Sequence, residues 1–399
     1  MRILAISAFF PPDAVGGYEV TARDTLTHLA RRGHDIAVLT AAPEKPLDEC
    51  NAAAFPIERT LRRLPYSIPA GNRFLDRLNA SCIHAHNYRV TREAIGRHAP
   101  DCIYLWSGAL LTAGVPAACE ASNMPLACHL GDTWFLEAAG RRGRGIGGMA
   151  MRLLRRLLGS REAVLDPRRW RHIYVSHFLR NHYRTCGIEA AASEVIYNGS
   201  EFASPPPAWS ATPPALFRLC FAGRLHPSKG VEMLLNAFAH MQDMPLHLDI
   251  FGAGQPDYER HLRAQASTMG LQERISWHGR VSHAALCDGY ARSHLFCMPS
   301  LWEEPFGLVV IEAMAQGLPV VATRRGGLPE LVAPGTGLLA DAEPTTFAAA
   351  MRALLSDWPA LRHASETAQR HARTNYQWPD KIDAIESFLR EMVHDARTV

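Results

Sequence analysis

Two glutamates in one stretch of the chain are the first candidates for chemistry. Glu304 precedes an apolar run over residues 308–316, and Glu312 lies inside that run. Burying a bare carboxylate is costly, so a ligand that carries hydroxyl groups would satisfy Glu312. On a continuous helix the two carboxylates would lie on one face, roughly 12 Å apart along the axis. This spacing suits a sugar at one end, a diphosphate in the middle and a ribose at the other end.

The flanking residues predict the elements that position these glutamates. Residues 295–298 and 319–323 are short apolar runs typical of buried strands, and residues 308–316 are typical of a helix that ends at Gly317. The free N–H groups and the positive dipole end of that helix attract phosphate. The residues at the predicted helix start are Pro305, Phe306, Gly307 and Leu308.

A pair of basic residues forms the second candidate. Arg224 and Lys229 lie five residues apart, between a predicted strand at 218–222 and the start of a helix. Cations in such a loop can clamp a diphosphate, because guanidinium and ammonium groups bind phosphate oxygens strongly. The alternative is that both are ordinary exposed loop residues.

The first part of the chain predicts a strand, a loop, a helix and a strand, which is the order of a parallel sheet with ligands at the carboxyl ends of its strands. Gly16 and Gly17 lie in that loop, where backbone N–H groups could approach a phosphate or sugar; turn formation alone also explains such a pair. His129 ends a predicted strand and is followed by Gly131 and Asp132. A lone histidine is often structural, but this position favours a functional role.

Composition limits the class of protein. A length of 399 residues with 47% hydrophobic residues predicts two to three domains. The nine cysteines include no C-x-x-C pair, which indicates neither a disulfide framework nor a zinc site and favours a reducing cytoplasm. Five prolines between residues 203 and 214 predict a linker. We therefore expect domains at 1–203 and 215–378, a linker at 204–214 and a final helix at 379–399.

Charge is concentrated in one segment. Residues 141–171 contain ten arginines against Glu162 and Asp166, although the whole chain carries only +3. Apolar and basic residues alternate at helical spacing between 146 and 158, which is typical of a membrane-surface helix. A helix packed on the first domain is an equal alternative. Nucleic acid is not the expected partner, because aromatic residues are not interleaved with the arginines except at Trp170.

The residues from Pro299 to Val332 carry a family resemblance. Glu304 and Glu312, with the flanking Pro-Phe-Gly-Leu, Glu-Ala-Met-Ala, Gly-Leu-Pro-Val-Val-Ala and Gly-Gly-Leu-Pro-Glu, resemble the retaining glycosyltransferases of family four. The resemblance implies the α/β GT-B fold, in which two Rossmann-like domains face each other across a cleft and the last helix crosses back to the first domain. It also implies transfer of a hexose-type sugar from a nucleoside-diphosphate sugar, with retention of configuration.

By this resemblance, four residues have catalytic roles: His129, Arg224, Lys229 and Glu304. Donor contacts are implied for Gly16, Gly17, Gly223, Gly252, Gly254, Arg280, Val281, Pro305, Phe306, Gly307, Leu308 and Glu312. The chain has no Asp-x-Asp motif, so we expect neither a metal nor a cofactor. We expect a glycan or glycolipid acceptor in cell-surface polysaccharide or glycolipid biosynthesis, and a cytoplasmic protein that can bind the inner membrane face through residues 141–171.

Two other functions compete with this prediction. One is a GT-B enzyme of another class, such as a sugar-nucleotide epimerase or a phosphorylase. The other is a non-catalytic protein that binds nucleotide sugars. The sequence does not disclose the nucleotide, the sugar, the acceptor or the oligomeric state.

Overall fold

The computed structural model describes residues 1–14, 16–43, 54–65, 73–136, 157, 159, 166–202, 204 and 208–398. The chain divides into two compact units. Unit 1 comprises Met1–Tyr197 together with Pro379–Val399, and unit 2 comprises Asn198–Trp378.

Unit 1 is built on a parallel sheet of seven strands in the order β3-β2-β1-β4-β5-β6-β7. Its strands are mostly continuous apolar runs, because helices bury both faces of a parallel sheet. The strands are β1 (Arg2–Ser7), β2 (Asp35–Ala41), β3 (Ile57–Leu61), β4 (Cys102–Leu105), β5 (Leu126–Leu130), β6 (Arg171–Tyr174) and β7 (Ala192–Val195).

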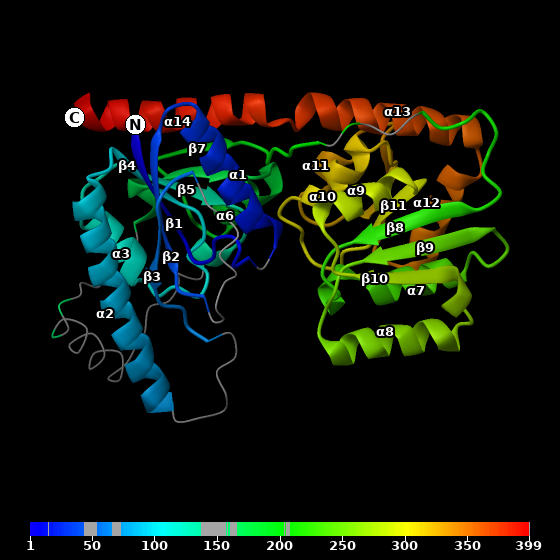
Figure 1. Cartoon of the computed structure of the whole chain (residues 1–399), viewed down its shortest axis with the longest axis horizontal. Coiled ribbons are helices and arrows are strands. Elements are labelled where there is room, and N and C mark those ends of the chain that lie inside the picture. The colour runs from blue at the N-terminus through cyan, green and yellow to red at the C-terminus, as the bar shows by residue number, and fades with distance from the viewer. Residues whose placement is uncertain are drawn as a thin grey trace. The chain divides into compact units, whose positions relative to one another are not determined.

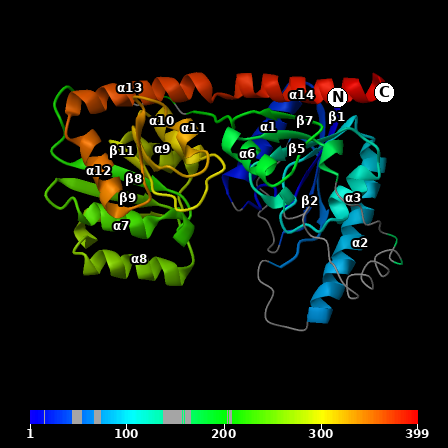
Figure 2. The same ribbon diagram turned by 180° about the vertical axis from the view of Figure 1, so that it is seen from behind.

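Helices cover both faces of this sheet (Figures 1 and 2), with α2 and α3 on one face and α1 on the other. The helices of this unit are α1 (Gly17–Arg31), α2 (Arg73–His98), α3 (Gly114–Glu120), α6 (His177–Thr185) and most of α14 (Trp378–Thr398). A short 3-10 helix, η1 (Pro167–Arg169), precedes β6.

Ion pairs attach α14 to unit 1. Arg32 lies 2.5 Å from Asp383 and 3.0 Å from Glu386, and the buried His34 lies 3.1 Å from Glu386. Farther along the helix, Arg171 pairs with Asp395. The last helix therefore completes unit 1 after the chain has passed through unit 2.

Unit 2 contains a second parallel sheet, in the order β10-β9-β8-β11-β12-β13. Its core lies between one sheet face and helices α7, α8 and α12. The strands are β8 (Phe217–Ala222), β9 (Leu246–Phe251), β10 (Ile275–Gly279), β11 (Leu295–Met298), β12 (Val320–Thr323) and β13 (Gly337–Ala340). The helices are α7 (Val231–Ala239), α8 (Pro256–Thr268), α9 (His283–Ala291), α10 (Leu308–Ala315), α11 (Leu328–Leu331), α12 (Pro344–Leu355) and α13 (Trp358–Asn375), with 3-10 turns η2 (Pro227–Lys229) and η3 (Gln272–Arg274).

The predicted domain limits need two corrections. The first boundary lies at Tyr197 and Asn198, earlier than residue 203. The described part of the predicted linker also packs on unit 2, because Trp209 stacks on Trp358 with ring centroids 5.4 Å apart. The Trp358 indole N–H, in turn, donates to the backbone carbonyls of Ser210 and Ala211. Residues 208–214 therefore form part of the second unit.

The predicted basic helix at 146–158 lies outside the described residues, except for Leu157. The end of the basic segment 141–171 is described and makes contacts within unit 1. Arg169 donates to the Asn123 side chain at 3.1 Å, and Arg171 belongs to β6 and pairs with Asp395. These two arginines therefore have structural partners.

Candidate active site

Two of the predicted catalytic residues contact each other in unit 2. Lys229 ends the turn η2 after β8, and its Nζ forms an ion pair with the Glu304 carboxylate in the loop before α10. The Ser300 hydroxyl donates to the same carboxylate oxygen at 3.0 Å. Glu304 is only 6% exposed, so the adjacent cation and the hydroxyl group compensate for the loss of hydration of its charge.

Backbone contacts bring these two loops together. Gly230 has a φ of +71°, and a Cβ there would lie 1.9 Å from the carbonyl oxygen of Pro299. The carbonyl oxygen of Ser228 accepts hydrogen bonds from the N–H groups of Leu301 and Trp302, at 2.9 and 3.2 Å. A residue with a side chain could not replace Gly230 without separating the loops, so this glycine fixes the position of Lys229 against Glu304.

A third loop holds Glu304 from its backbone side. The Gly327 N–H donates to the Glu304 carbonyl at 2.6 Å, and a Cβ on Gly326 would lie 2.1 Å from that oxygen. The neighbouring Glu303 carboxylate pairs with Arg325 at 3.1 Å. No role was predicted from the sequence for Ser300, Glu303 or Arg325, although the acidic pair at 303–304 was a visible signal.

The other predicted basic residues are available to a ligand. Arg224 and Arg280 are exposed, and neither forms a hydrogen bond or ion pair with another described residue. Arg224 follows Gly223, whose φ is +156°, and Arg280 follows β10. Because both guanidinium groups lack a protein partner in the described part of the chain, they can bind an anion without breaking an existing contact.

The glycines after β9 have a structural explanation. A Cβ on Gly252, whose φ is +136°, would lie 1.8 Å from the Gly223 carbonyl oxygen, and a Cβ on Gly254 would lie 2.0 Å from that of Leu225. The loops after β8 and β9 are thus in backbone contact at the carboxyl edge of the sheet. Close packing of the protein chain itself requires these two glycines, whether or not they also contact a donor.

Glu304 and Glu312 lie on one continuous segment, but not on one continuous helix. Helix α10 begins at Leu308, because its N-cap Gly307 has a φ of +127° and cannot continue a helix backwards. The spacing of roughly 12 Å, which holds for a continuous helix, therefore does not apply to Glu304 and Glu312, whereas the predicted helix at 308–316 is present as α10. Phe306 is buried, whereas Pro305, Leu308 and Val281 are partly exposed. The Glu312 side chain is 17% exposed and lies 3.8 Å from His283.

His129 lies in unit 1, near the carboxyl end of β5, and aromatic rings hold it in place. Its ring stacks on Trp106 with a centroid distance of 4.0 Å and an interplanar angle of 10°. Its Nδ1 is 2.6 Å from the Tyr104 hydroxyl. His129 is 1% exposed, and Tyr104 and Trp106 are fully buried, so the orientation of the imidazole is fixed by packing. These aromatic partners were not predicted from the sequence.

The Gly16–Gly17 turn lies beside the same cluster. Glu19 accepts the Gly16 N–H at 2.8 Å, and α1 begins at Gly17. The next residue, Tyr18, donates to the backbone carbonyl of His129 and also approaches that of Trp106. Burial, followed by the charge of Asp132, raises the pKa of Tyr18 well above its usual value, so its hydroxyl remains a donor. The turn and His129 are thus connected through Tyr18.

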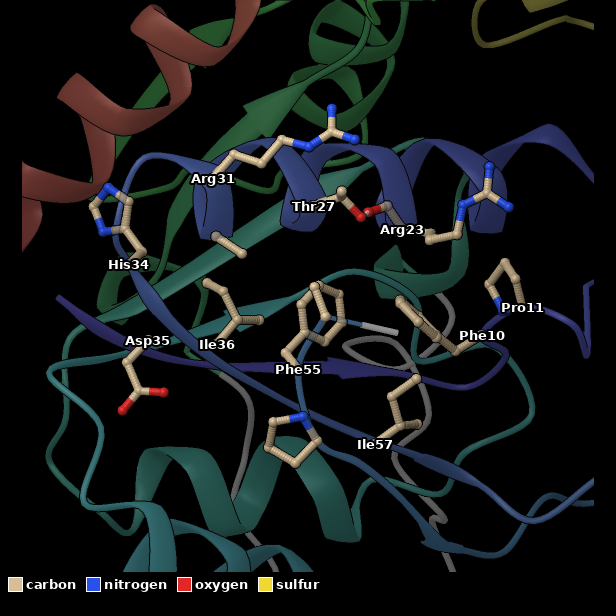
Figure 3. A pocket seen from close by; sticks show the side chains of 13 residues that line it. Phe10, Pro11, Arg23, Thr27, Arg31, His34, Asp35, Ile36, Phe55 and Ile57 are labelled. Atoms are coloured by element: carbon tan, nitrogen blue, oxygen red, sulfur yellow. Dashed lines mark hydrogen bonds between the residues drawn. The ribbon is translucent and has the colours of Figure 1, made fainter. Parts of the chain in front are cut away.

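Unit 1 also contains a cavity of about 550 Å³. Helix α1 lines it with Arg23, Thr27 and Arg31, and the apolar side chains include Phe55 and Ile57 (Figure 3). Figure 3 shows both guanidinium groups directed away from these apolar side chains, and Arg23 pairs with Asp24 at 2.7 Å. No predicted site residue lines this cavity, so its size alone does not identify it as the reaction site.

The described residues contain neither a metal cluster nor a membrane-spanning helix. No group of three or more His, Cys, Asp or Glu side chains among them is arranged to hold a metal ion. Among the helices described, none combines the length and apolar character needed to cross a bilayer.

Similarities to known proteins match the division into units. A model for "Glycosyltransferase Family 4" matches residues 15–202, and a model for "Glycosyl transferases group 1" matches residues 211–371. D-inositol 3-phosphate glycosyltransferase of Corynebacterium glutamicum is 35% identical over 186 residues, which are 44% of this chain and 43% of that protein. The corresponding enzyme of Rhodococcus opacus is 35% identical over 174 residues, or 41% of this chain and 39% of its own length. These alignments span less than half of each relative.

Solved structures match over almost the entire chain. Sucrose-phosphate synthase from Thermosynechococcus elongatus has a TM-score of 0.75 at 20% identity and covers 99% of both chains. Anabaena HepE in complex with UDP and glucose has a TM-score of 0.68 at 23% identity, covering 98% of this chain and 99% of its own. These similarities confirm the GT-B class of fold. Because family models match both units, the chain belongs to the family 4, group 1 glycosyltransferases.

Proposed function

We propose that this protein transfers a hexose-type sugar from a nucleoside-diphosphate sugar to a hydroxyl group of an acceptor, with retention of anomeric configuration. The observation that carries this proposal is the contact between Lys229 and Glu304 beside the start of α10, with Arg224 exposed on a neighbouring loop. A cation for phosphate and a carboxylate for sugar hydroxyls are the groups that such a donor needs. The structure of Anabaena HepE with UDP and glucose adds support and makes UDP the first nucleotide to test.

In the proposed mechanism, the protein stabilises charge on the leaving diphosphate. Arg224, Lys229 and the N–H groups at the start of α10 bind the diphosphate as the glycosidic bond breaks. Glu304 has one carboxylate oxygen occupied by Lys229 and Ser300, and its second oxygen accepts hydroxyl groups of the sugar. Glu312 binds the ribose. The acceptor oxygen attacks from the face that the diphosphate leaves, which preserves the configuration.

The proposal gives unit 1 the task of orienting the donor sugar. His129 is fixed by Tyr104 and Trp106, so its imidazole can select one arrangement of sugar hydroxyls without first losing conformational freedom. Gly17, at the start of α1, offers a backbone N–H without a side chain in the way.

The first experiment is a thermal-unfolding panel with UDP, GDP, ADP and dTDP, each also as a nucleotide sugar. A ligand at 100 times its Kd should stabilise the protein by about 2.7 kcal/mol. One responding nucleotide identifies the donor class, and chromatography of the products then separates transfer from release of free sugar or sugar phosphate, which an epimerase or a phosphorylase would give. A panel without any response would contradict the proposal.

Catalysis should not require a divalent metal, because basic side chains serve the diphosphate. We expect turnover in the presence of EDTA to remain within about two-fold of turnover in Mg²⁺, since each cation is expected to contribute roughly 3 kcal/mol without a metal. Complete loss of turnover in EDTA, restored by Mg²⁺, would show that a metal neutralises the diphosphate instead.

We further propose a glycan or glycolipid acceptor in polysaccharide or glycolipid assembly at the cytoplasmic face of the membrane, with residues 141–171 as the membrane contact. Eight arginines of this segment suit anionic headgroups, since the other two, Arg169 and Arg171, have partners within unit 1. The names of the C. glutamicum and R. opacus relatives supply inositol 3-phosphate as a competing acceptor. Product formation with D-inositol 3-phosphate, compared with formation on a glycolipid in vesicles, distinguishes the two.

A further inference from the structure

His283 lies beside Glu312 and takes no part in the mechanism proposed above. His283 is the first residue of α9, where the Ser282 hydroxyl accepts the N–H of Ala285 at 3.2 Å and caps the helix. Its Nε2 lies 3.8 Å from Oε1 of Glu312 on α10. The histidine side chain is 57% exposed and the glutamate side chain 17%, so an exposed group at the start of α9 lies beside a mostly buried carboxylate within α10.

The contact with His283 can orient the Glu312 carboxylate. Among the described residues, His283 is the basic side chain within ion-pair distance of Glu312, which otherwise lies on an apolar helix. The His283 ring is also 3.8 Å from the Cys287 sulfur. Contacts with Cys287 and Glu312 together raise the pKa of His283 to about 10, which keeps the imidazole charged at neutral pH. Burial, followed by the charge of Glu312, raises the pKa of the fully buried Tyr290 phenol well above its usual value, so this phenol remains neutral.

We propose that His283 is a positioning residue that holds the Glu312 carboxylate for the ribose of the donor and thereby makes the site select ribose over 2′-deoxyribose. This inference rests on the proposed function. At 3.8 Å the cation attracts the carboxylate without a close hydrogen bond, so both carboxylate oxygens remain available to hydroxyl groups. A site that pairs a charged acceptor with a hydroxyl rejects the analogue that lacks it, because the acceptor is then left unpaired.

The test measures Kd by titration calorimetry on the full chain, with UDP, GDP and ADP and with the 2′-deoxy form of each. The variants are His283→Ala, His283→Lys, Glu312→Gln and the double variant His283→Ala/Glu312→Gln. His261→Ala is the matched control, because His261 lies 3.7 Å from Glu232 in an exposed pair elsewhere in unit 2. The wild type and the control should prefer the ribonucleotide by about ten-fold, which corresponds to about 1.4 kcal/mol.

We expect His283→Ala to reduce this preference to below about three-fold, and Glu312→Gln to reduce it equally. The double variant should resemble Glu312→Gln alone, since His283 acts through that carboxylate. His283→Lys, which retains a cation, should restore most of the preference. These results together would support a positioning role, which a general loss of folding could not imitate.

Two results would overturn the inference while leaving the proposed function intact. One is an unchanged preference for the ribonucleotide in His283→Ala. The other is full additivity of the two single variants, which would mean that His283 acts independently of Glu312. Failure of the wild type to bind any of the nucleotides would overturn both the inference and the proposed function.

Discussion

In unit 2 two predicted catalytic residues, Lys229 and Glu304, are charged and contact each other, whereas in unit 1 the predicted catalytic residue His129 is packed among aromatic rings. Lys229 and Glu304 meet because loops after β8, β11 and β12 are joined by backbone contacts. His129 and Gly17 are held by side chains of Tyr104, Trp106 and Tyr18. Both sheets are parallel, so the difference lies in the residues at and beyond the strand ends and not in the strand arrangement.

This comparison separates two tasks that one fold can perform. Charged groups on loops can bind an anion, whereas aromatic rings packed in a core can only fix the orientation of a neighbouring group. Unit 2 should therefore determine the affinity for the nucleotide and the rate at which the bond between the diphosphate and the sugar breaks. Unit 1 should determine the orientation of the sugar, with little effect on the nucleotide itself.

The largest effect should come from removing a cation of unit 2. Arg224→Ala and Lys229→Ala should each lower turnover by about 100-fold or more, if each cation supplies roughly 3 kcal/mol to the transition state. The two should differ in stability, measured by chemical unfolding. Lys229→Ala leaves the buried Glu304 carboxylate without its cation and should destabilise the fold, whereas Arg224 is exposed and should leave stability unchanged.

A Lys229→Ala variant that keeps turnover within a few-fold of wild type would remove Lys229 from the site. Equal losses of stability in both variants would show that Arg224 also has a structural partner. Either result would weaken the contrast between the two units.

The next effect concerns the loop contact in unit 2. Gly230→Ala should lower the free energy of unfolding by about 2–3 kcal/mol and reduce turnover, because its Cβ would overlap the Pro299 carbonyl. Gly270→Ala is the control: its φ of +70° is close to the +71° of Gly230, but a Cβ there meets nothing within 4 Å. We expect this control to cost only about 1 kcal/mol, the cost of a positive φ. Similar values for both would mean that loop contact is unimportant.

A smaller effect is expected from unit 1. Tyr104→Phe removes the hydroxyl that lies 2.6 Å from Nδ1 of His129 and should lower kcat/KM about five-fold, the equivalent of about 1 kcal/mol. The Kd of the free nucleotide should not change, because Tyr104 acts on the sugar through His129. A weakened nucleotide Kd in this variant would break the division of tasks between the units.

The last prediction concerns stability and not turnover, as an acid dependence of unit 1. Loss of hydration opposes the ionised form of Glu386, but contacts with Arg32, Arg390 and His34 outweigh it and lower the pKa of this carboxyl from 4.5 to about 2. Because the folded-state pKa is depressed, the stabilisation is present above pH 4.5 and is lost as the pH falls towards 2. Glu386→Gln should reduce the slope of unfolding free energy against pH in this window. An unchanged slope would exclude Glu386 as its source.

Much of the fold could be predicted because buried parallel strands are short apolar runs. The strand at 295–298 was predicted with the bounds that the structure has, and the predicted strands at 218–222 and 319–323 each differ from the observed strand by one residue. The long helix α2 was not predicted, since its buried positions include the polar residues Ser81, His84, Asn87 and Thr91, which conceal the apolar face. Periodicity is informative only where burial and hydrophobicity coincide.

The candidate site was predictable as a set of residue types but not as a set of contacts. The Lys229–Glu304 pair joins residues 75 positions apart, and no local pattern states which loops will meet. The glycines were assigned to ligand contact, whereas Gly252 and Gly254 are required by neighbouring backbone. The aromatic support of His129 comes from separate strands and loops, so it emerges only when the sheet forms.

The return of the chain to unit 1 at Pro379 has a consequence for synthesis on the ribosome. The unit left at Tyr197 is completed only by Pro379–Val399, so the whole of unit 2 must be translated first. At about 5–20 residues per second, the nascent first unit waits roughly ten to forty seconds for the helix that carries Asp383, Glu386 and Asp395. Unit 2 is contiguous and can fold during this interval. The second unit in the sequence is therefore expected to be the first to reach its final structure.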